Sequence, residues 1–503
     1  MNRSKEKNTM FVSRRSQYGL FLLTILLACT LAGAGARADG LRLRSLGGAT
    51  LAIEDRDNGI NPFDFGRNPA WLGNDFDYQY IRFIANLDET SGDLRRLYDP
   101  GVINDFYVGF SGIKSLSDRQ VVSGYIDYQR LQDRETPFNL ESDQYNDVFY
   151  LTDQTIGDFE YYGPRTSVDY SLRLRDDLYI GAGFDYEINT GLKQEYTRPQ
   201  IVHNYFRGYF GLTWQPSSEW VLGASYIPTR LQDRTKFEKP DEGFDNVVLI
   251  YSGDDIYELR AFSSQQFMET MYSHVFSAQA FYMTGDLSAG LIGKVGTKDN
   301  ELKYSPSRMY EKGYWEQTLY ELDLRARYAP EGTNWALGLT GGIKSDDGWG
   351  VRPDFDEVLL YDNPYRVYRA GFGAAYRIAP VDVTLIGEYV LEKNDIEAND
   401  YGAGLTRKSD AVTNIGRLGV EKRILNVYSF RAGFELTDYP IDRWLKLPQN
   451  IDIYRYTAGI GYYIGGWEID LHLMYADWRK DDTDRERNEM GAVLWFTRIV
   501  GGI

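Results

Sequence analysis

The sequence predicts an all-β protein, a transmembrane antiparallel β-barrel of about 14–18 strands. Three observations support this prediction: an export signal, period-two alternation of polar and apolar residues along most of the chain, and short turns that alternate with long polar connections. We interpret residues 1–38 as a signal peptide, 39–75 as a separate N-terminal segment, and 76–503 as the barrel itself.

The N-terminus has the three parts of a secretory signal. Basic residues within positions 3–15 precede an apolar stretch at 19–31, which is too short to cross a bilayer comfortably, and Ala-Arg-Ala at 36–38 is a cleavage site of the A-x-A type. Cys29 leaves lipidation open as an alternative. Cleavage after position 38 would leave a mature chain without cysteine, and disulfides are then excluded.

The composition excludes several classes of protein. Mean hydropathy is -0.45 and no apolar run of membrane-spanning length follows the signal, which excludes a helical membrane protein. The net charge of -18 argues against nucleic-acid binding. The 3 His show no metal-ligand spacing and no G-x-S-x-G elbow occurs, so we expect no enzyme, no cofactor and no metal centre.

Residues 39–75 are rich in glycine and turn residues and do not alternate. A G-G-A sequence, an acidic turn and N-P-A-x-L before the first strand resemble the start of the long-chain fatty acid transporter (FadL-like) barrels and of PorV-type barrels. That resemblance implies 14 strands and a hatch inside the barrel; the alternative is a periplasmic lead-in. The residues that carry the resemblance are Gly47, Gly48, Ala49, Asp55, Asp57, Asn68, Pro69 and Ala70, followed by Leu72.

The stretch 166–189 shows the strand pattern most clearly. Val168, Tyr170 and Leu172 alternate with polar residues, and after Asp176-Asp177 the alternation resumes, which is the pattern of a hairpin. Eight such hairpins and one strand at each end predict 18 strands. We place the short turns near 115–119, 175–177, 215–219, 284–286, 329–333, 379–380, 423–426 and 465–466. We place the long connections at 88–105, 131–165, 190–203, 231–272, 297–314, 345–365, 393–413, 439–451 and 478–488.

Aromatic residues stand where membrane interfaces are expected. Trp214 with Trp220, and Tyr328 with Trp335, flank short turns, as the aromatic girdles of a barrel require. Residues 489–496 resemble the C-terminal signal read by the barrel-assembly machinery, which we therefore expect as a partner. The tail 497–503 departs from that signal, so the sequence does not decide which residues form the closing strand.

The polar half of each strand is expected to line the lumen. These side chains carry both signs, and we expect cross-strand Arg–carboxylate ladders that either brace the wall or form a charged constriction. The candidates are Asp169, Arg173, Arg175, Asp185, Glu187, Arg207, Glu321, Asp323, Arg325, Arg327, Arg369, Arg377, Asp382, Glu388, Arg431, Glu435, Glu468 and Asp470. The segments 147–151 and 247–251 are expected to cover the mouth, and the loop clusters Asp346-Asp347, Asp354 with Asp356, and Asp481-Asp482 with Asp484 could bind calcium.

The predicted location is the outer membrane of a bacterium, in contact with its lipid. The resemblance implies passive transport of small hydrophobic or amphipathic molecules, whereas the charged lumen favours a porin for polar solutes. A structural or secretion-associated scaffold that docks a partner protein is the third hypothesis.

Overall fold

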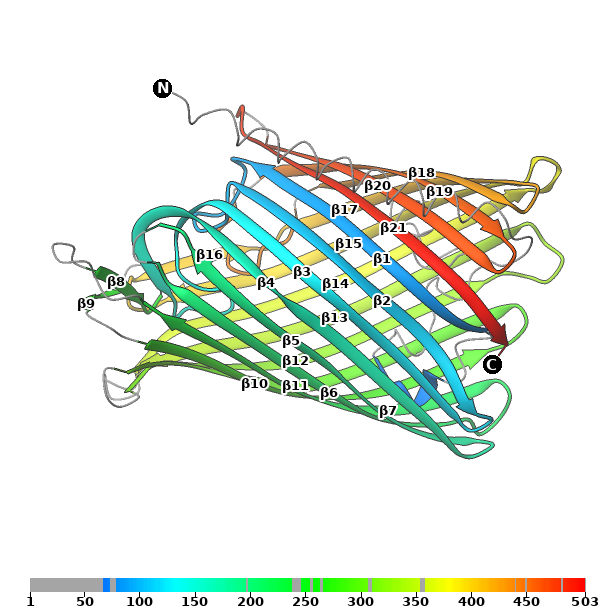
Figure 1. The fold of residues 1–503 in the computed structure, drawn as a ribbon, viewed down its shortest axis with the longest axis horizontal. Helices are drawn as coiled ribbons and strands as arrows, with labels where there is room; N and C mark the ends of the chain where they lie inside the picture. The colour runs from blue at the N-terminus through cyan, green and yellow to red at the C-terminus, as the bar shows by residue number, and fades with distance from the viewer. Residues whose placement is uncertain are drawn as a thin grey trace, which may run out of the picture.

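The computed structural model describes residues 67–72, 78–195, 198–237, 246–253, 257–262, 266–305, 310–352, 358–438, 440–447, 450–480 and 483–502, and its strands form a long, tilted barrel (Figure 1). The strands are β1 (Tyr78–Gly92), β2 (Val102–Ser117), β3 (Gln120–Asn139), β4 (Leu151–Arg175), β5 (Leu178–Lys193), β6 (Gln200–Trp214), β7 (Trp220–Lys236), β8 (Asn246–Tyr251), β9 (Tyr257–Phe262), β10 (Gln266–Met283), β11 (Leu287–Ser305), β12 (Tyr310–Tyr328), β13 (Trp335–Arg352), β14 (Val358–Ile378), β15 (Val383–Asp400), β16 (Leu405–Ser409), β17 (Val412–Ile424), β18 (Tyr428–Asp438), β19 (Ile451–Ile464), β20 (Trp467–Lys480) and β21 (Glu486–Gly502), with two short 3₁₀ helices, η2 (Pro69–Trp71) and η4 (Ala379–Val381).

The wall of the barrel is one closed antiparallel sheet. The sheet has 21 strands; β8, β9 and β16 are short additions at the mouth, which leaves 18 strands in the wall. β7 pairs directly with β10, and β15 pairs directly with β17. β1 pairs with β21 from Tyr78 to Gly92, which closes the barrel and removes both sheet edges. The predicted class and the count of 18 are confirmed, and the count of 14 is wrong.

All eight predicted short turns separate consecutive wall strands. Most of the long connections are shorter than predicted, whereas β18 ends at Asp438 and β19 begins at Ile451, close to the predicted 439–451. β3 continues to Asn139 and β4 begins at Leu151, so only 140–150 remain of the predicted connection 131–165. The strands continue beyond the membrane as paired ribbons. Polar and apolar residues do not alternate regularly in these extensions, although backbone pairing persists.

The outer face of the barrel is apolar. Phe110, Phe372 and Leu418 are 56%, 60% and 62% exposed, and Trp214, Trp220 and Tyr328 lie exposed beside short turns as predicted. A closed barrel with such a face and aromatic girdles is a bacterial outer-membrane protein. Within the described residues, no helix is long and apolar enough to cross a membrane.

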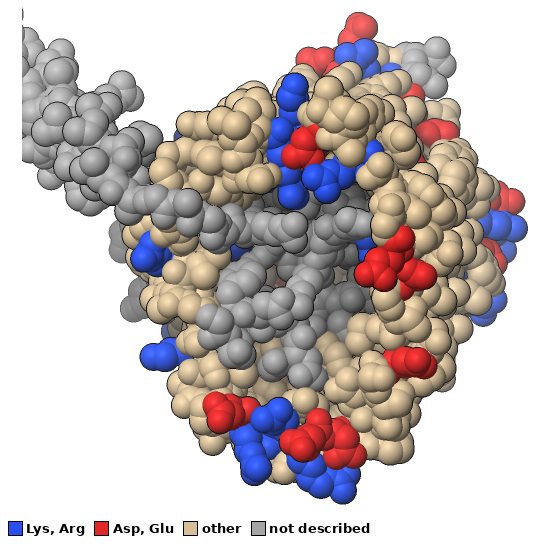
Figure 2. Space-filling model, turned by 90° about the vertical axis from the view of Figure 1, so that its right-hand side faces the viewer, with Lys and Arg blue, Asp and Glu red and all other residues tan. Residues whose placement is uncertain are grey.

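The end that carries the short turns is polar. Figure 2 looks onto this end, where basic and acidic side chains are interspersed around the rim. Arg175 pairs with Asp177 at 3.2 Å, and Arg377 pairs with Asp382 at 2.8 Å. In outer-membrane barrels the short turns face the periplasm and the longer connections face outside, and we use this orientation below.

The C-terminal strand shows where the barrel closes, which the sequence left undecided. The tail that departs from the insertion signal is part of β21, because Thr497, Arg498 and Ile499 pair with β1. The strand therefore closes the barrel along its whole length, and the tail extends the alternation rather than ending it.

Candidate functional site: a lumen between two closures

The docking segment, residues 67–72, lies against the inner wall near the short turns. Asn68 is fully buried, and its side-chain oxygen accepts a hydrogen bond from the backbone N–H of Ala70 at 3.1 Å, which caps η2. Its amide nitrogen faces four acceptors on β6, β7 and β10, including Leu212 O at 3.1 Å and Gln279 Oε1 at 3.0 Å. One asparagine therefore joins the segment to three strands.

Glycines on the wall make room for this segment. A Cβ added at Gly181 would lie 2.3 Å from the backbone nitrogen of Ala70, and one added at Gly211 would lie 1.9 Å from Oδ1 of Asn68. A Cβ added at Gly223 on β7 would lie 2.9 Å from Nδ2 of Asn68. The three glycines form a notch in the wall. The backbone of residues 69–70 and the side chain of Asn68 fill the space that side chains of the wall would otherwise occupy.

Ionic and apolar contacts flank the notch. Arg67 pairs with Asp169 at 2.9 Å and with Asp185 at 3.1 Å, and its guanidinium lies 4.4 Å from the centre of the Tyr209 ring. Trp71 and Leu72 are buried in a cluster with residues of β2, β3, β7, β10 and β11. The segment is thus held by a salt bridge on one side and by apolar burial on the other.

An ionic ladder crosses the opposite wall. Arg417 on β17 lies between Glu388 on β15, at 3.7 Å, and Glu435 on β18, at 2.7 Å. Glu435 also pairs with Arg455 on β19, which reaches Glu489 on β21 at 4.0 Å. The ladder therefore alternates in sign from β15 to β21, as the sequence predicted in outline, and each charge faces a neighbour of opposite sign.

Other predicted lumen residues fall into local groups. Arg431 and Asp470 form a fully buried pair, Arg369 pairs with Glu392 at 2.5 Å, and Glu321 pairs with Lys294 at 2.6 Å. Asp323 lies beside Glu321 and near Arg325, and Glu468 is 1% exposed. Glu187 accepts from Asn189, and Arg327 is on β12.

Four predicted residues lie at the periplasmic end, among them Arg377, which pairs with Asp382. Arg173 donates to the carbonyl of Asp118 in a turn at 2.9 Å, Arg175 is paired in its own turn, and Asp382 follows η4 in a left-handed conformation with φ of 47°. Asp382 is therefore a turn residue rather than part of a strand, because the turn that begins at Ala379 extends to Asp382, two residues beyond the predicted 379–380.

An apolar cluster closes the mouth. It joins residues of the mouth segment, residues 140–150, to the β8–β9 hairpin and to the outer ends of the wall strands. Phe149 is 2% exposed and sits over Gly313, where an added Cβ would lie 2.2 Å from its ring, and Trp315 is fully buried. The prediction that 147–151 and 247–251 cover the mouth is confirmed, since Val148, Phe149, Val248 and Ile250 share this cluster.

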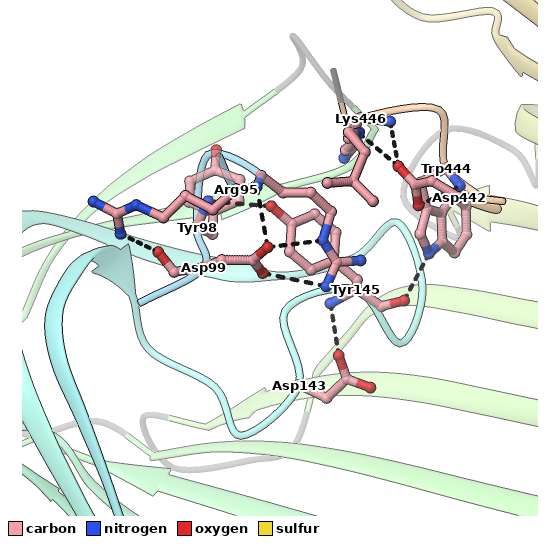
Figure 3. Close-up of polar contacts among 10 residues, drawn as sticks. Arg95, Tyr98, Asp99, Asp143, Tyr145, Asp442, Trp444 and Lys446 are labelled. Atoms are coloured by element: carbon pink, nitrogen blue, oxygen red, sulfur yellow. Dashed lines mark hydrogen bonds and ion pairs between the residues drawn. The ribbon is translucent and has the colours of Figure 1, made fainter. Parts of the chain in front are cut away.

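Polar contacts tie three connections together above this cluster (Figure 3). Tyr145 Oη accepts from the backbone N–H of Tyr98 at 3.1 Å, and Trp444 Nε1 donates to the carbonyl of Tyr145 at 2.7 Å. Asp442 accepts from the backbone N–H of Lys446 at 2.6 Å. The guanidinium of Arg96 stacks on the Tyr145 ring at 3.7 Å. Residues 93–101, 140–150 and 440–447 therefore form one unit.

Two carboxyl groups of the mouth segment are buried. Burial raises the pKa of Glu141 well above its ordinary value, and nearby Glu269 and Asp147 reinforce the shift. Burial likewise raises the pKa of Asp147 to about 6, against opposing hydrogen bonds from Phe149 N–H and Asn300 and the charge of Lys298. Burial therefore shifts both groups, Glu141 and Asp147, toward their protonated forms.

A cavity of about 420 Å³ lies in the lumen beside the docking segment. Its lining includes Arg67 of that segment, Arg207 on β6, and Lys294 and Lys298 on β11. Lys298 also donates to the carbonyl of Asn146 at 3.3 Å and to its side-chain oxygen at 2.6 Å. The cavity thus has the docking segment on one side and the mouth segment on the other.

The comparisons with known proteins identify a family. A family model described as a family of unknown function, DUF6850, matches residues 69–429. The chain belongs to this family. The DUF6850 match begins within the docking segment and includes every strand that lines the cavity. The search of curated proteins returned no match.

Several solved structures show similarity to the chain. The ferric preacinetobactin receptor BauA from Acinetobacter baumannii is 9% identical, with 84% of this chain and 80% of that chain covered and a TM-score of 0.45. The toluene transporter TodX from Pseudomonas putida is 12% identical, with 93% and 99% covered and a TM-score of 0.35. The outer membrane transporter YddB from Escherichia coli is 7% identical, with 84% and 81% covered and a TM-score of 0.42.

Several site residues were not predicted. Arg67, Lys294, Lys298, Arg417 and Arg455 were missed, although alternation with outward neighbours such as Val295 and Leu418 would have placed the last four in the lumen. Of the hatch candidates, Gly47, Gly48, Ala49, Asp55 and Asp57 lie outside the described residues.

One of the loop clusters proposed to bind calcium is not in a loop. Asp346 and Asp347 are on β13 rather than in a loop, and Asp346 pairs with Arg443 at 2.8 Å. Asp354, Asp356, Asp481 and Asp482 lie outside the described residues. In the part of the chain that the structure describes, no group of three or more His, Cys, Asp and Glu residues could hold a metal ion.

Proposed function

We propose that the chain is a gated outer-membrane channel for passive passage of small molecules, with residues 39–75 as a hatch inside the barrel. The observation that carries this proposal is a lumenal cavity between the docking segment and the mouth segment, neither of which is a strand of the wall. A docked segment separates from the wall without breaking the hydrogen bonds of the sheet, so either closure can open while the barrel stays intact.

Small hydrophobic or amphipathic molecules are the proposed substrates. The cavity lining mixes apolar side chains, such as Met271 and Leu319, with the cations Arg207 and Lys294. The resemblance of the N-terminal segment to FadL-like barrels supports the same class. The rival is a polar-solute porin, which the ladder from Glu388 to Glu489 favours because it supplies a charged, hydrated wall.

Planar-bilayer recording separates these possibilities. We expect the mature chain to conduct rarely and a variant lacking residues 39–75 to conduct more often, because the deletion removes the docking segment from the lumen while the mouth segment stays in place. A second variant that lacks only 39–66 keeps the docking segment and serves as the control. Steady conductance of the intact chain would favour the open porin, and silence of all three proteins would reject the channel.

A scaffold that docks a partner protein is the second candidate. Large apolar side chains are exposed at the mouth end: Tyr257 and Leu259 on β9 are 55% and 56% exposed, and Tyr401 is 54% exposed. If these side chains contact a partner, a protein should co-purify in a fixed ratio, and changing Tyr257 and Leu259 to serine should release it. The same partner at full yield with this variant would reject the contact.

A further inference from the structure

We propose that the lumenal cavity is a binding site for a small organic carboxylate, in which Arg207 holds the carboxylate group. This inference rests on the proposed function, because it names the class of molecule that the lumen recognises. The cavity volume, about 420 Å³, lies within the range of roughly 300–1,000 Å³ that is usual for small-molecule sites.

The charges on the cavity wall favour an anion. Four cationic side chains line the cavity, Arg67, Arg207, Lys294 and Lys298, whereas Glu321 is the one carboxylate that lines it among the described residues. Arg67 and Lys294 already face carboxylates, and Lys298 is engaged by Asn146.

Arg207 differs from these three cations. Its Nε donates to Thr229 Oγ1 at 3.3 Å, and its guanidinium lies 5.1 Å from the centre of the Tyr205 ring. Among the described residues, no carboxylate forms an ion pair with Arg207. The hydroxyl and the ring fix the plane of the guanidinium, and its two terminal amino groups are left for a bidentate contact, which matches the geometry of a carboxylate.

The rest of the lining describes the body of the ligand. Met271, Val275 and Leu319 supply apolar surface, and Ser273 supplies a hydroxyl. An inorganic anion would leave this apolar surface unused, and a neutral apolar molecule would offer no acceptor to the two terminal amino groups of Arg207. A molecule with one carboxylate and a compact apolar body satisfies both.

Calorimetry on the mature protein in detergent micelles tests the site, with benzoate, benzyl alcohol and inorganic phosphate as probes. We expect benzoate to bind at least tenfold more tightly than either other probe. The variant Arg207→Gln should weaken benzoate binding tenfold or more. Arg369→Gln, a lumen change outside the cavity lining, is the matched control and should bind as the wild type does.

Other outcomes would overturn the proposal. Equal binding of benzyl alcohol would remove the role of the charge, and equal binding of phosphate would remove the organic class. Unchanged binding by Arg207→Gln would remove the assignment of the residue. If that variant fails to fold, as judged by heat-modifiable migration in gels, Thr229→Val should still weaken benzoate binding several-fold, and unchanged binding would contradict the site.

The test is independent of channel activity. If the mature protein binds benzoate but the variant lacking residues 39–75 does not conduct, the binding site is supported and the channel is rejected. Conductance without benzoate binding would leave the channel and reject the site.

Discussion

The notch that receives the docking segment makes a sharp test of the gate. Replacing Gly181 with alanine would place a Cβ 2.3 Å from the backbone nitrogen of Ala70 and 2.4 Å from the carbonyl carbon of Pro69. Ordinary contacts begin near 3.4 Å. Both atoms belong to backbone rather than to a flexible side chain, so the segment must move by about 1 Å or leave the wall.

The magnitude follows from the contacts that such a movement breaks. Asn68 Nδ2 lies 3.0 Å from Gln279 Oε1 and 3.1 Å from Leu212 O, and Ser171 Oγ lies 2.9 Å from Ala70 O. A displacement of about 1 Å lengthens all three beyond hydrogen-bonding distance. At about 1 kcal/mol for each bond, docking weakens by roughly 3 kcal/mol, which is a change of about a hundredfold in the docking equilibrium.

Two measurements follow docking directly. Single-channel recording should show more frequent or larger openings for Gly181→Ala than for the wild type. A cysteine introduced at Trp71, in a mature chain without other cysteines, should react faster with a membrane-impermeant maleimide when Gly181 is alanine than when it is glycine. Gly416→Ala is the control, because an added Cβ there meets open space. If Gly181→Ala and Gly211→Ala both keep wild-type conductance and slow labelling, the docking segment does not gate the lumen.

Three further predictions address the mouth and the ladder. Trp444→Ala should destabilise the closed mouth by about 3 kcal/mol, because the indole is 5% exposed and donates a hydrogen bond to Tyr145. Faster hydrogen exchange of residues 140–150 would show this loss, and the same change at exposed Trp349 should have little effect. Since burial raises the pKa of Asp147 to about 6, the closed mouth should be most stable below about pH 4 and lose up to roughly 3 kcal/mol as the pH rises through 6. Asp147→Asn should flatten this pH dependence. If the protection of residues 140–150 from hydrogen exchange changed with pH equally in the wild type and the variant, the prediction would be contradicted. Arg417→Gln should lower the free energy of unfolding in urea by about 2 kcal/mol, whereas Arg130→Gln in an exposed pair should change it by less than about 1 kcal/mol. Equal losses for the two variants would mean that the ladder stabilises the barrel no more than an exposed ion pair does.

The wall of the barrel could be predicted from the sequence because its determinants are local. Alternation fixes which side chain faces lipid, and a turn is recognised from the residues at the turn itself, so all eight short turns were found. The outer limits of the strands could not be found in this way. β4 extends to Leu151 through residues in which polar and apolar side chains do not alternate regularly, and its pairing depends on β3 rather than on its own pattern.

The candidate site was harder to predict because it depends on partners distant in the chain. Asp169 and Asp185 were assigned to the lumen by alternation, yet their partner Arg67 lies about a hundred residues earlier, outside any strand. The ladder was predicted as a type of contact but not as a set of pairs, since Arg417 meets Glu435 only through the register of β17 and β18. A glycine in a strand does not show by itself that another segment docks on it.

The two closures use the same device at opposite ends of the barrel. At one end Ala70 sits over Gly181, and at the other Phe149 sits over Gly313, with Gly350 beside it. In both places the wall loses side chains where a docked segment contributes backbone or an aromatic ring, so the contact is close but is not part of the sheet. Each closure can therefore be weakened by adding one methyl group to the wall. That the barrel itself has no free edge explains why such a change should affect the gate before it affects the fold.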